Sequence, residues 1–455
     1  MARVFVSKNP FTQQVYRNFE FASSSEVEAA LTESANSFKV FSQKSFSERA
    51  QKLTALGQIL REQKQELAHL MAIEMGKPLQ SGISEILKCA ECCDYYAQNA
   101  ENLLSDESFS LPDGKCYVKY QPLGPILSIM PFNFPFWMPF KMSIPHLMAG
   151  NTIILKHAEN LPQCAVKVDE ITTQAGLEHE VKNLFLSIDQ VKQVIADSRI
   201  KGVSLTGSVG AGKAVASLAA SHMKKFVMEL GGSDPFIVLQ DADVQSSVSA
   251  LVTARLQVTG CTCISPKRAI ISKEIYDQFE SALANEVAKW SYGDPTEQET
   301  QLGPLAREDL ADQLQKQIED SVGMGARVVY GGERLGATMI QPTVLADVTP
   351  EMPVFHTETF GPVFCLVKSE NEEHAVQLAN DTEYGLGASI FTSNKEKAER
   401  EIAPRIESGM CFVNSPVKSI VEVPFGGVKN SGLGRELGGL GIKEFTNPKT
   451  IFIKN

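Results

Sequence analysis

Short apolar runs that alternate with helix patterns constrain the fold of this chain more than any other feature. Five of them lie between residues 126 and 228: Ile126–Met130, Thr152–Leu155, Asn183–Leu186, Gly202–Leu205 and Lys225–Met228. Seven more follow: Phe236–Leu239, Ala269–Ile271, Arg327–Tyr330, Thr343–Leu345, Val363–Val367, Ala388–Phe391 and Met410–Val413. Stretches with helical spacing, such as 161–175 and 189–195, separate the runs. This alternation predicts two α/β units, each with a parallel sheet covered on both faces, joined near Glu229–Pro235.

The other segments are expected to flank these units. Residues 5–21 have the pattern of a short strand pair, and three amphipathic helices follow up to about residue 104. The segment Phe109–Tyr120 places a Pro-Asp-Gly turn between alternating residues, which predicts a β-hairpin. An isolated hairpin is marginal in water, so we expect it to pair with another segment or another chain. The terminal run Thr450–Lys454 is the natural candidate.

Composition excludes several classes of function. The net charge of −11 argues against a nucleic-acid partner or an anionic membrane surface, because either would call for a basic face. No apolar run is long enough to span a membrane, and Met1–Ser7 lacks the features of a signal peptide. The nine cysteines are scattered and odd in number, which favours a reducing compartment. We therefore expect a soluble cytoplasmic protein, and no metal site, since Cys89, Cys92 and Cys93 have no matching ligand pair nearby.

Two cysteines that follow a glycine are the candidate nucleophiles. Cys261 and Cys263 stand between two apolar runs, and Gly260 allows the backbone to bend and present a side chain to a cleft. The alternative is that both are small buried core residues, as free cysteines commonly are. The nucleophile interpretation requires other residues that could assist a thiol in catalysis.

Two other strand ends carry suitable groups. Asn133 lies in Pro131-Phe-Asn-Phe-Pro135, directly after a predicted strand, where its amide can donate a hydrogen bond to a developing oxyanion. Glu229 follows another apolar run, and apolar surroundings raise the pKa of a carboxyl toward that of a general base. A turn-closing Asn and a solvated Glu are the plainer alternatives.

Further strand ends are typical of nucleotide contacts. Lys156 and Glu159 can meet a ribose or a phosphate, or can be ordinary surface charges. The turn Gly207-Ser-Val-Gly-Ala-Gly212 precedes a helix and can expose N–H groups to a pyrophosphate. Gly207 and Gly212-Lys213 also fit phosphate-loop spacing, which would indicate a nucleotidase, but Ala214 lacks the hydroxyl that holds magnesium. The glycine- and aromatic-rich loops 356–362 and 424–435 are typical of a wall around a flat ligand, or of surface turns.

Taken in order, these segments resemble the aldehyde dehydrogenase superfamily over essentially the whole chain. The resemblance implies two doubly wound parallel-sheet domains plus a bridging β-hairpin. The implied division is a cofactor-binding domain (1–102 and 123–229), an oligomerisation hairpin (103–122), a catalytic domain (230–440) and a C-terminal oligomerisation strand (441–455). The family's thiol motif places the nucleophile at Cys263, with Cys261 where the family usually has glutamine. It also implies Asn133 as the oxyanion donor and Glu229 as the general base.

The same resemblance implies the ligand contacts. Those to the dinucleotide are Pro131, Phe132, Lys156, Glu159, Gly207, Ser208, Gly212, Leu230, Glu358 and Phe360. The implied reaction oxidises an aldehyde to a carboxylic acid through a cysteine thioester. NAD is expected over NADP, which stays possible, because a carboxylate at Glu159 would repel a 2′-phosphate.

The chain looks most like the succinate-semialdehyde dehydrogenase branch of that family. The branch holds its substrate carboxylate with two arginines and a serine. Ser419 meets the serine position, but Lys141 and Gln257 stand at the arginine positions. Lysine can attract a carboxylate without the bidentate fork, whereas Gln257 offers neutral donors, with Arg255 nearby in sequence. A neutral aliphatic or aromatic aldehyde is the alternative, favoured by Phe136, Trp137 and Phe140.

Two further expectations concern assembly and regulation. The family resemblance implies a homo-oligomer, either a dimer or a tetramer. The spacing of Cys261 and Cys263 would allow a strained, reducible disulfide that switches the enzyme off.

Overall fold

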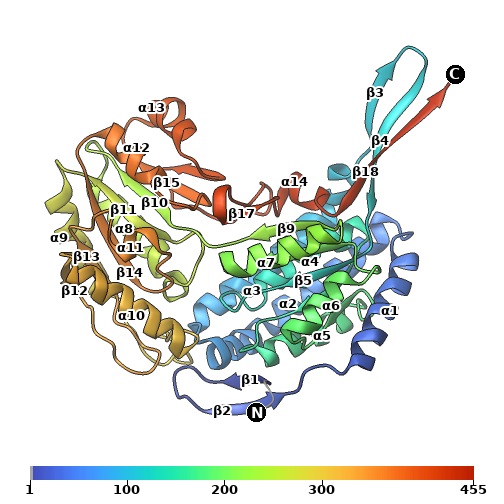
Figure 1. The fold of residues 1–455 in the computed structure, drawn as a ribbon, viewed down its shortest axis with the longest axis horizontal. Coiled ribbons are helices and arrows are strands. Elements are labelled where there is room, and N and C mark those ends of the chain that lie inside the picture. The colour runs from blue at the N-terminus through green and yellow to red at the C-terminus, as the bar shows by residue number, and fades with distance from the viewer. Residues whose placement is uncertain (1–3) are drawn as a thin grey trace.

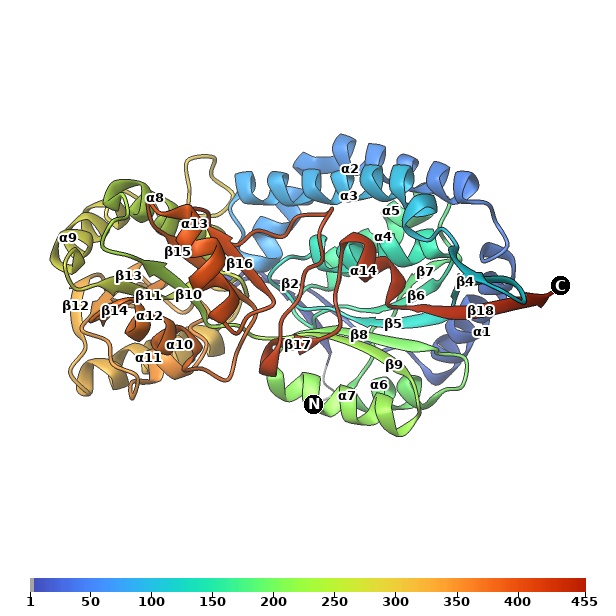
Figure 2. The ribbon, with the colours of Figure 1, turned by 90° about the horizontal axis from the view of Figure 1, so that it is seen from above.

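The computed structural model describes residues 4–455, so the first three residues of the predicted cofactor domain lie outside it. Two sheets dominate the molecule and lie in separate lobes, with a third, smaller sheet extending from one of them (Figures 1 and 2). The predicted α/β class is confirmed.

The first lobe is built on a six-stranded sheet in the order β17-β9-β8-β5-β6-β7. Its strands are β5 (Pro125–Ile129), β6 (Thr152–Lys156), β7 (Val181–Asn183), β8 (Gly202–Thr206), β9 (Lys225–Glu229) and β17 (Gly432–Leu433). All neighbours pair in parallel except β17, which is antiparallel to β9.

Helices cover both faces of this sheet, as Figure 2 shows. One face packs on α2 (Phe46–Met75), α3 (Leu79–Leu103), α4 (Trp137–Ala149) and α5 (Pro162–Gln174). The other packs on α1 (Ser24–Phe41), α6 (Ile188–Ala196) and α7 (Val209–Ser221). The short pair β1 (Phe5–Lys8) and β2 (Val15–Phe19) lies beside them, as predicted for residues 5–21.

The second lobe has a seven-stranded sheet in the order β12-β13-β14-β11-β10-β15-β16. Its strands are β10 (Asp234–Val238), β11 (Pro266–Ser272), β12 (Arg327–Tyr330), β13 (Thr343–Ala346), β14 (Val363–Ser369), β15 (Gly387–Phe391) and β16 (Met410–Val413). Helices α8 (Val244–Leu256) and α9 (Tyr276–Val287) cover one face. On the other face lie α10 (Glu308–Gly323), α11 (Pro353–His356) and α12 (Glu372–Asn380). The edge strand β12 runs antiparallel to β13, an exception to the predicted parallel order.

The third sheet contains the predicted hairpin. Strands β3 (Glu107–Leu111) and β4 (Gly114–Pro122) pair around the Pro-Asp-Gly turn, and β18 (Thr446–Lys454) pairs with the other edge of β4. The terminal segment is therefore the hairpin's partner within the chain. Figure 1 shows this sheet reaching away from both lobes, with the C-terminus at its end.

Two strand predictions need correction. The run Asn183–Leu186 was expected to be a strand, but β7 ends at Asn183, and Leu184 and Leu186 contribute instead to the core between the sheet, α1 and α6. Strand β17 was not expected, because it contains only Gly432 and Leu433. Its pairing needs glycine at 432, where a Cβ atom would lie 2.0 Å from the Met228 carbonyl oxygen.

Candidate active site

The loop that carries Cys261 and Cys263 is held in an unusual backbone conformation. Val258, Thr259 and Gly260 all have positive φ, at 51°, 51° and 78°. Two β-branched residues in this region cost energy, so the surroundings must hold them. The Thr259 hydroxyl accepts a hydrogen bond from the Gly303 N–H, and buried Arg255 donates to the Gly260 carbonyl. The predicted role of Gly260 in bending the chain is consistent with this geometry.

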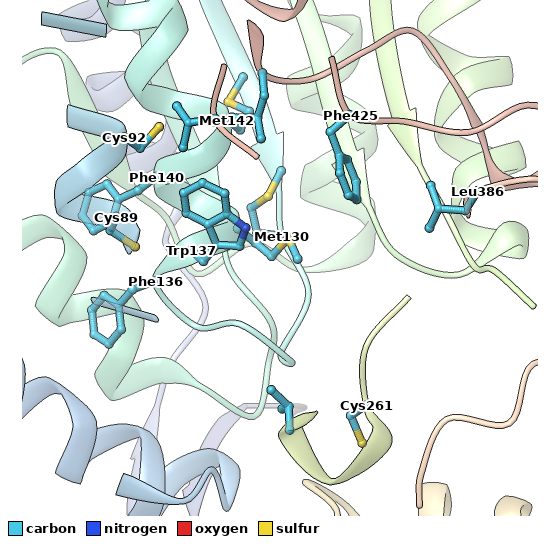
Figure 3. Packing of buried hydrophobic residues seen from close by; sticks show 14 of the residues in the cluster. Cys89, Cys92, Met130, Phe136, Trp137, Phe140, Met142, Cys261, Leu386 and Phe425 are labelled. Atoms are coloured by element: carbon cyan, nitrogen blue, oxygen red, sulfur yellow. The ribbon is translucent and has the colours of Figure 1, made fainter. Parts of the chain in front are cut away.

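The two thiols end up in different surroundings. Cys261 is buried, and its Sγ lies 3.6 Å from the Phe360 carbonyl oxygen, to which it can donate. Figure 3 shows its sulfur turned away from Trp137 and Phe425. Cys263 instead lines a cavity of about 490 Å³, together with Trp137, Lys141 and Phe425. The reading of both cysteines as core residues therefore fits Cys261 alone.

Burial raises the pKa of the Cys263 thiol to about 12, while the charges of Lys267 and Lys141 act in the opposite direction. Lys267 is fully buried and donates to the carbonyl oxygens of Thr262 and Cys263. It also lies 3.2 Å from the Glu358 carboxylate. Sequence reasoning missed Lys267, although it follows the nucleophile closely in Ser-Pro-Lys-Arg268.

Two hydrogen-bond donors are candidates for stabilising an oxyanion, although Asn133 is not among the residues that line the cavity. The Asn133 side-chain amide donates to the Cys261 carbonyl oxygen at 2.9 Å, which leaves the second N–H of the same amide free. Within residues 4–455, the backbone N–H of Cys263 donates to no acceptor. These are the donors that an oxyanion on a Cys263 adduct would need.

Glu229 ends β9 and is buried, and neither of its carboxylate oxygens has a hydrogen-bond partner among the described residues. Burial, and then the charge of Glu436, holds its pKa well above the usual range. Gly426 packs against it so closely that a Cβ atom there would lie 2.5 Å from Glu229 Oε1. Part of the loop 424–435, which was predicted as a wall around a flat ligand or as a surface turn, therefore packs against the candidate base.

The three predicted substrate contacts, Lys141, Gln257 and Ser419, all line the cavity with Cys263. Lys141 is buried and forms an ion pair with Glu436, a residue that sequence reasoning missed. The Ser419 hydroxyl is buried without a partner among the described residues. Arg255, noted as a nearby cation, is taken up by backbone carbonyls and by the Ser265 and Thr359 hydroxyls, and is not among the residues lining this cavity.

Several of the predicted cofactor contacts share one sheet edge. Pro131 and Phe132 follow β5, and Gly207 and Ser208 follow β8. Lys156 is the last residue of β6, and Glu159 lies three residues beyond it. These three strands are neighbours and run parallel, so their carboxyl ends meet at one edge, where α/β folds bind nucleotides. Ser208 caps α7 by accepting from the Ala211 N–H, and no residue in the first turn of α7 is acidic.

This edge fits a dinucleotide. Apart from its own helix backbone and chain neighbours, no atom of the described residues lies within 4 Å of a Cβ placed on Gly210, so the start of α7 is open to a pyrophosphate. The Thr206 hydroxyl beside it is buried without a partner among the described residues. Gly212 differs, since a Cβ atom there would meet the Leu230 side chain at 2.5 Å, so this glycine allows α7 to pack on Leu230.

The remaining predicted cofactor contacts come from the second lobe. Phe360 lies edge-on to Phe132, with ring centroids 6.0 Å apart, and Glu358 accepts from the Gly232 N–H at 3.2 Å. The pair Phe132 and Phe360 joins the end of β5 to the loop before β14. The candidate site thus lies between the lobes.

Comparisons with known proteins give the family. The aldehyde dehydrogenase family model matches residues 2–451. The chain belongs to the aldehyde dehydrogenase family, and it is accordingly an NAD(P)-dependent aldehyde-oxidising enzyme. The nucleotidase alternative is thereby excluded.

Its relatives point to one branch. The chain is 41% identical over 452 residues to a Deinococcus radiodurans protein named succinate-semialdehyde dehydrogenase (NADP+), covering 99% of this chain and 94% of that protein. It is 42% identical over 450 residues to the Escherichia coli K12 succinate semialdehyde dehydrogenase (NAD(P)+), covering 98% and 97%. The Streptococcus pyogenes succinic semialdehyde dehydrogenase, solved with NADP+, superposes with a TM-score of 0.96 at 37% identity, covering 99% and 100%.

No described helix is long and apolar enough to cross a membrane. Within residues 4–455 no cluster of His, Cys, Asp and Glu could hold a metal ion.

Proposed function

We propose that this enzyme oxidises succinate semialdehyde to succinate, with Cys263 as the nucleophile and NAD(P) as the electron acceptor. The observation that carries the proposal is the shared cavity, in which Cys263 meets Lys141, Gln257 and the unpartnered Ser419 hydroxyl. The names of relatives at about 41% identity over the whole chain support the same substrate.

The chain's own residues account for the chemistry. The Cys263 thiolate adds to the aldehyde carbonyl, and the Asn133 amide with the Cys263 N–H stabilises the oxyanion. A dinucleotide bound at this site would supply the acceptor for the hydride that is lost from the adduct. The resulting thioester is hydrolysed by a water molecule whose proton passes to Glu229, the thiolate leaves, and the acid is released.

The dinucleotide contacts belong to the same proposal. Lys156 and Glu159 hold the adenosine ribose, and Gly207, Ser208 and the open start of α7 hold the pyrophosphate. Pro131, Phe132, Leu230, Glu358 and Phe360 surround the nicotinamide end. Gly212 supports this site through helix packing, as its contact with Leu230 indicates.

The domain division, the oligomeric state and the cellular location of the protein are part of the same proposal. We place the cofactor domain at 1–102 and 123–229, the catalytic domain at 230–440, and the oligomerisation segments at 103–122 and 441–455. A homo-oligomer is supported by Phe109, Phe452 and Ile453, which are about half exposed on the three-stranded sheet. A cytoplasmic location is supported by the nine unpaired cysteines.

The test is a panel of aldehydes with NAD and NADP, using wild type and Cys263→Ser. Succinate semialdehyde should give a higher kcat/KM than propanal or hexanal, and Cys263→Ser should abolish activity while dinucleotide binding survives. Cys261→Ala should be a milder defect. No preference for succinate semialdehyde would show that the substrate is a neutral aldehyde, and activity in Cys263→Ser would place the nucleophile elsewhere.

A further inference from the structure

Among the described residues, one cation in the wall of the cavity is partly shielded from water and forms no ion pair. The cavity that contains Cys263 is lined by three lysines, Lys88, Lys141 and Lys418, and by Glu85. Two of these charges are already matched, since Lys141 pairs with Glu436 and Glu85 pairs with the buried Lys77. Lys418 is exposed to solvent. The half-buried Lys88 is left as the uncompensated charge that is shielded from water.

No carboxylate among the described residues forms an ion pair with Lys88, although the charge of Glu91 acts on it from farther away. It lies on α3, and its Nζ sits 4.6 Å from the centre of the Trp137 ring, on α4. Among the described residues, no carboxylate lies within 4.0 Å of it. Burial, and then the charge of Lys141, lowers the pKa of Lys88 to about 8. A lysine withdrawn from water without a partner is uncommon, because desolvation of the ammonium is costly.

Lys88 shares two cavities with Ser419, whose hydroxyl is the predicted donor to a substrate carboxylate. Lys88 and Ser419 both line the cavity of Cys263 and both line a second, adjoining cavity that continues along Glu91, Tyr95 and Glu422. They therefore stand where the two cavities meet. The Ser419 hydroxyl has no partner among the described residues, so an ammonium and a hydroxyl are available at this junction.

We propose that Lys88 is the specificity-determining residue that binds the distal carboxylate of the substrate, together with the Ser419 hydroxyl. This assignment rests on the proposed function. It moves the role of carboxylate recognition away from Lys141, whose charge is balanced by Glu436, and away from Gln257, which is neutral. In the free enzyme the ammonium lies on the face of the Trp137 ring, and a bound carboxylate would supply its counter-charge.

The experiment compares Lys88→Met, Lys88→Arg and the control Lys418→Met with wild type, using succinate semialdehyde and butanal. Lys88→Met should raise the KM for succinate semialdehyde about 30-fold, the change that corresponds to loss of a charged hydrogen bond of about 2 kcal/mol. Its kcat/KM for butanal should stay within about twofold of wild type, which also shows that the variant is folded. Lys88→Arg should recover part of the loss. Lys418→Met should leave the kinetic constants for both substrates unchanged.

An unchanged ratio of the two KM values in Lys88→Met would overturn the proposal, as would a loss confined to Lys418→Met. Inhibition of butanal oxidation by succinate and by butanoate gives a second readout that does not depend on turnover of the semialdehyde. Lys88→Met should weaken inhibition by succinate and leave that by butanoate unchanged. If wild type shows no preference for succinate semialdehyde, the proposed function fails. The role of Lys88 is overturned separately if Lys88→Met leaves inhibition by succinate unaltered.

Discussion

The side chain of Glu159 bears on the choice between the two dinucleotides. It lies just beyond β6, its side chain is 46% exposed, and Lys156 Nζ is 3.8 Å away. If Glu159 faces the ribose as proposed, its carboxylate would accept from a 2′-hydroxyl and repel a 2′-phosphate, whereas the names of the relatives specify NADP+ or NAD(P)+. The chain is therefore expected to prefer NAD.

Replacing Glu159 with Gln should remove that repulsion without changing the shape of the side chain. We expect the KM for NADP to fall about tenfold, a change of about 1.4 kcal/mol, while the KM for NAD changes little. Steady-state kinetics with both dinucleotides measure this. A wild type that already prefers NADP, with no effect of Glu159→Gln, would show that Glu159 does not face the ribose.

The reactivity of the Cys263 thiol is expected to depend on pH. Because burial raises its pKa to about 12, the resting enzyme holds a protonated thiol at neutral pH, and the thiolate fraction grows with pH. Alkylation of the cofactor-free enzyme by iodoacetamide should accelerate about tenfold per pH unit between about pH 7 and 9. Cys263→Ser provides the background from the other cysteines. A rate that is flat from about pH 7 upward would mean that the thiolate is already formed.

The proposed Cys261–Cys263 disulfide gains no support at this scale, since the Cys261 sulfur lies against the Phe360 carbonyl while Cys263 lines the cavity. Reversible inactivation by peroxide that disappears in Cys261→Ala would be needed to restore it.

At the scale of elements, the buried carboxylate of Glu85 ties α3 to the start of α4. The Glu85 carboxylate pairs with Lys77 and accepts from the N–H groups of Phe136 and Trp137. It therefore satisfies donors at the helix N-terminus that would otherwise be orphaned. The same contacts fix Trp137, the ring on which Lys88 lies.

Lys77→Met should leave the Glu85 charge buried without its partner and lower the free energy of unfolding by about 3 kcal/mol. Lys316→Met is the matched control, because Lys316 pairs with Asp320 on the exposed face of α10 and should barely affect stability. Urea denaturation of both variants measures the difference. Equal effects of the two substitutions would mean that the Lys77–Glu85 pair does not stabilise this junction.

Elements with strong patterns could be predicted from the sequence, and contacts between distant segments could not. Most strands of the two large sheets follow from apolar runs, because a buried parallel strand needs apolar side chains on both faces. Strand β17 has two residues and no pattern, so only the structure reveals its pairing with β9. Likewise, Lys141 and Glu436 lie far apart in sequence, and Lys88 is hidden in an ordinary helix pattern. The candidate nucleophile, amide and base could be proposed because each lies in a short local motif.

At the scale of the whole molecule, the three-stranded sheet exposes apolar side chains that nothing in the chain covers among the described residues. It extends from the body with apolar side chains exposed, including Phe452 and Ile453 on β18 (Figure 1). Pairing with a second copy would cover these side chains.

The double variant Phe452→Asp/Ile453→Asp should therefore sediment as a monomer, whereas wild type should sediment as a dimer or tetramer. Analytical ultracentrifugation separates these species. Met223→Asp changes an exposed apolar side chain outside this sheet and serves as a control that should keep the wild-type mass. A wild-type monomer, or a double variant with the mass of wild type, would show that this sheet does not mediate assembly.

The two lobes bring a nucleophile and a base near one another, since the charge of Glu229 acts on Cys263, and we expect a thioester to form on Cys263 and to be hydrolysed with the help of Glu229. The most direct measurement is a single-turnover experiment with Glu229→Gln, succinate semialdehyde and NAD(P), followed by mass spectrometry of the peptides. We predict a burst of reduced dinucleotide equal to the enzyme present, slow turnover afterwards, and a succinyl group on the peptide at Cys263. Steady turnover at the wild-type rate would show that Glu229 is not the base, and an acyl group on Cys261 would show that Cys263 is not the nucleophile.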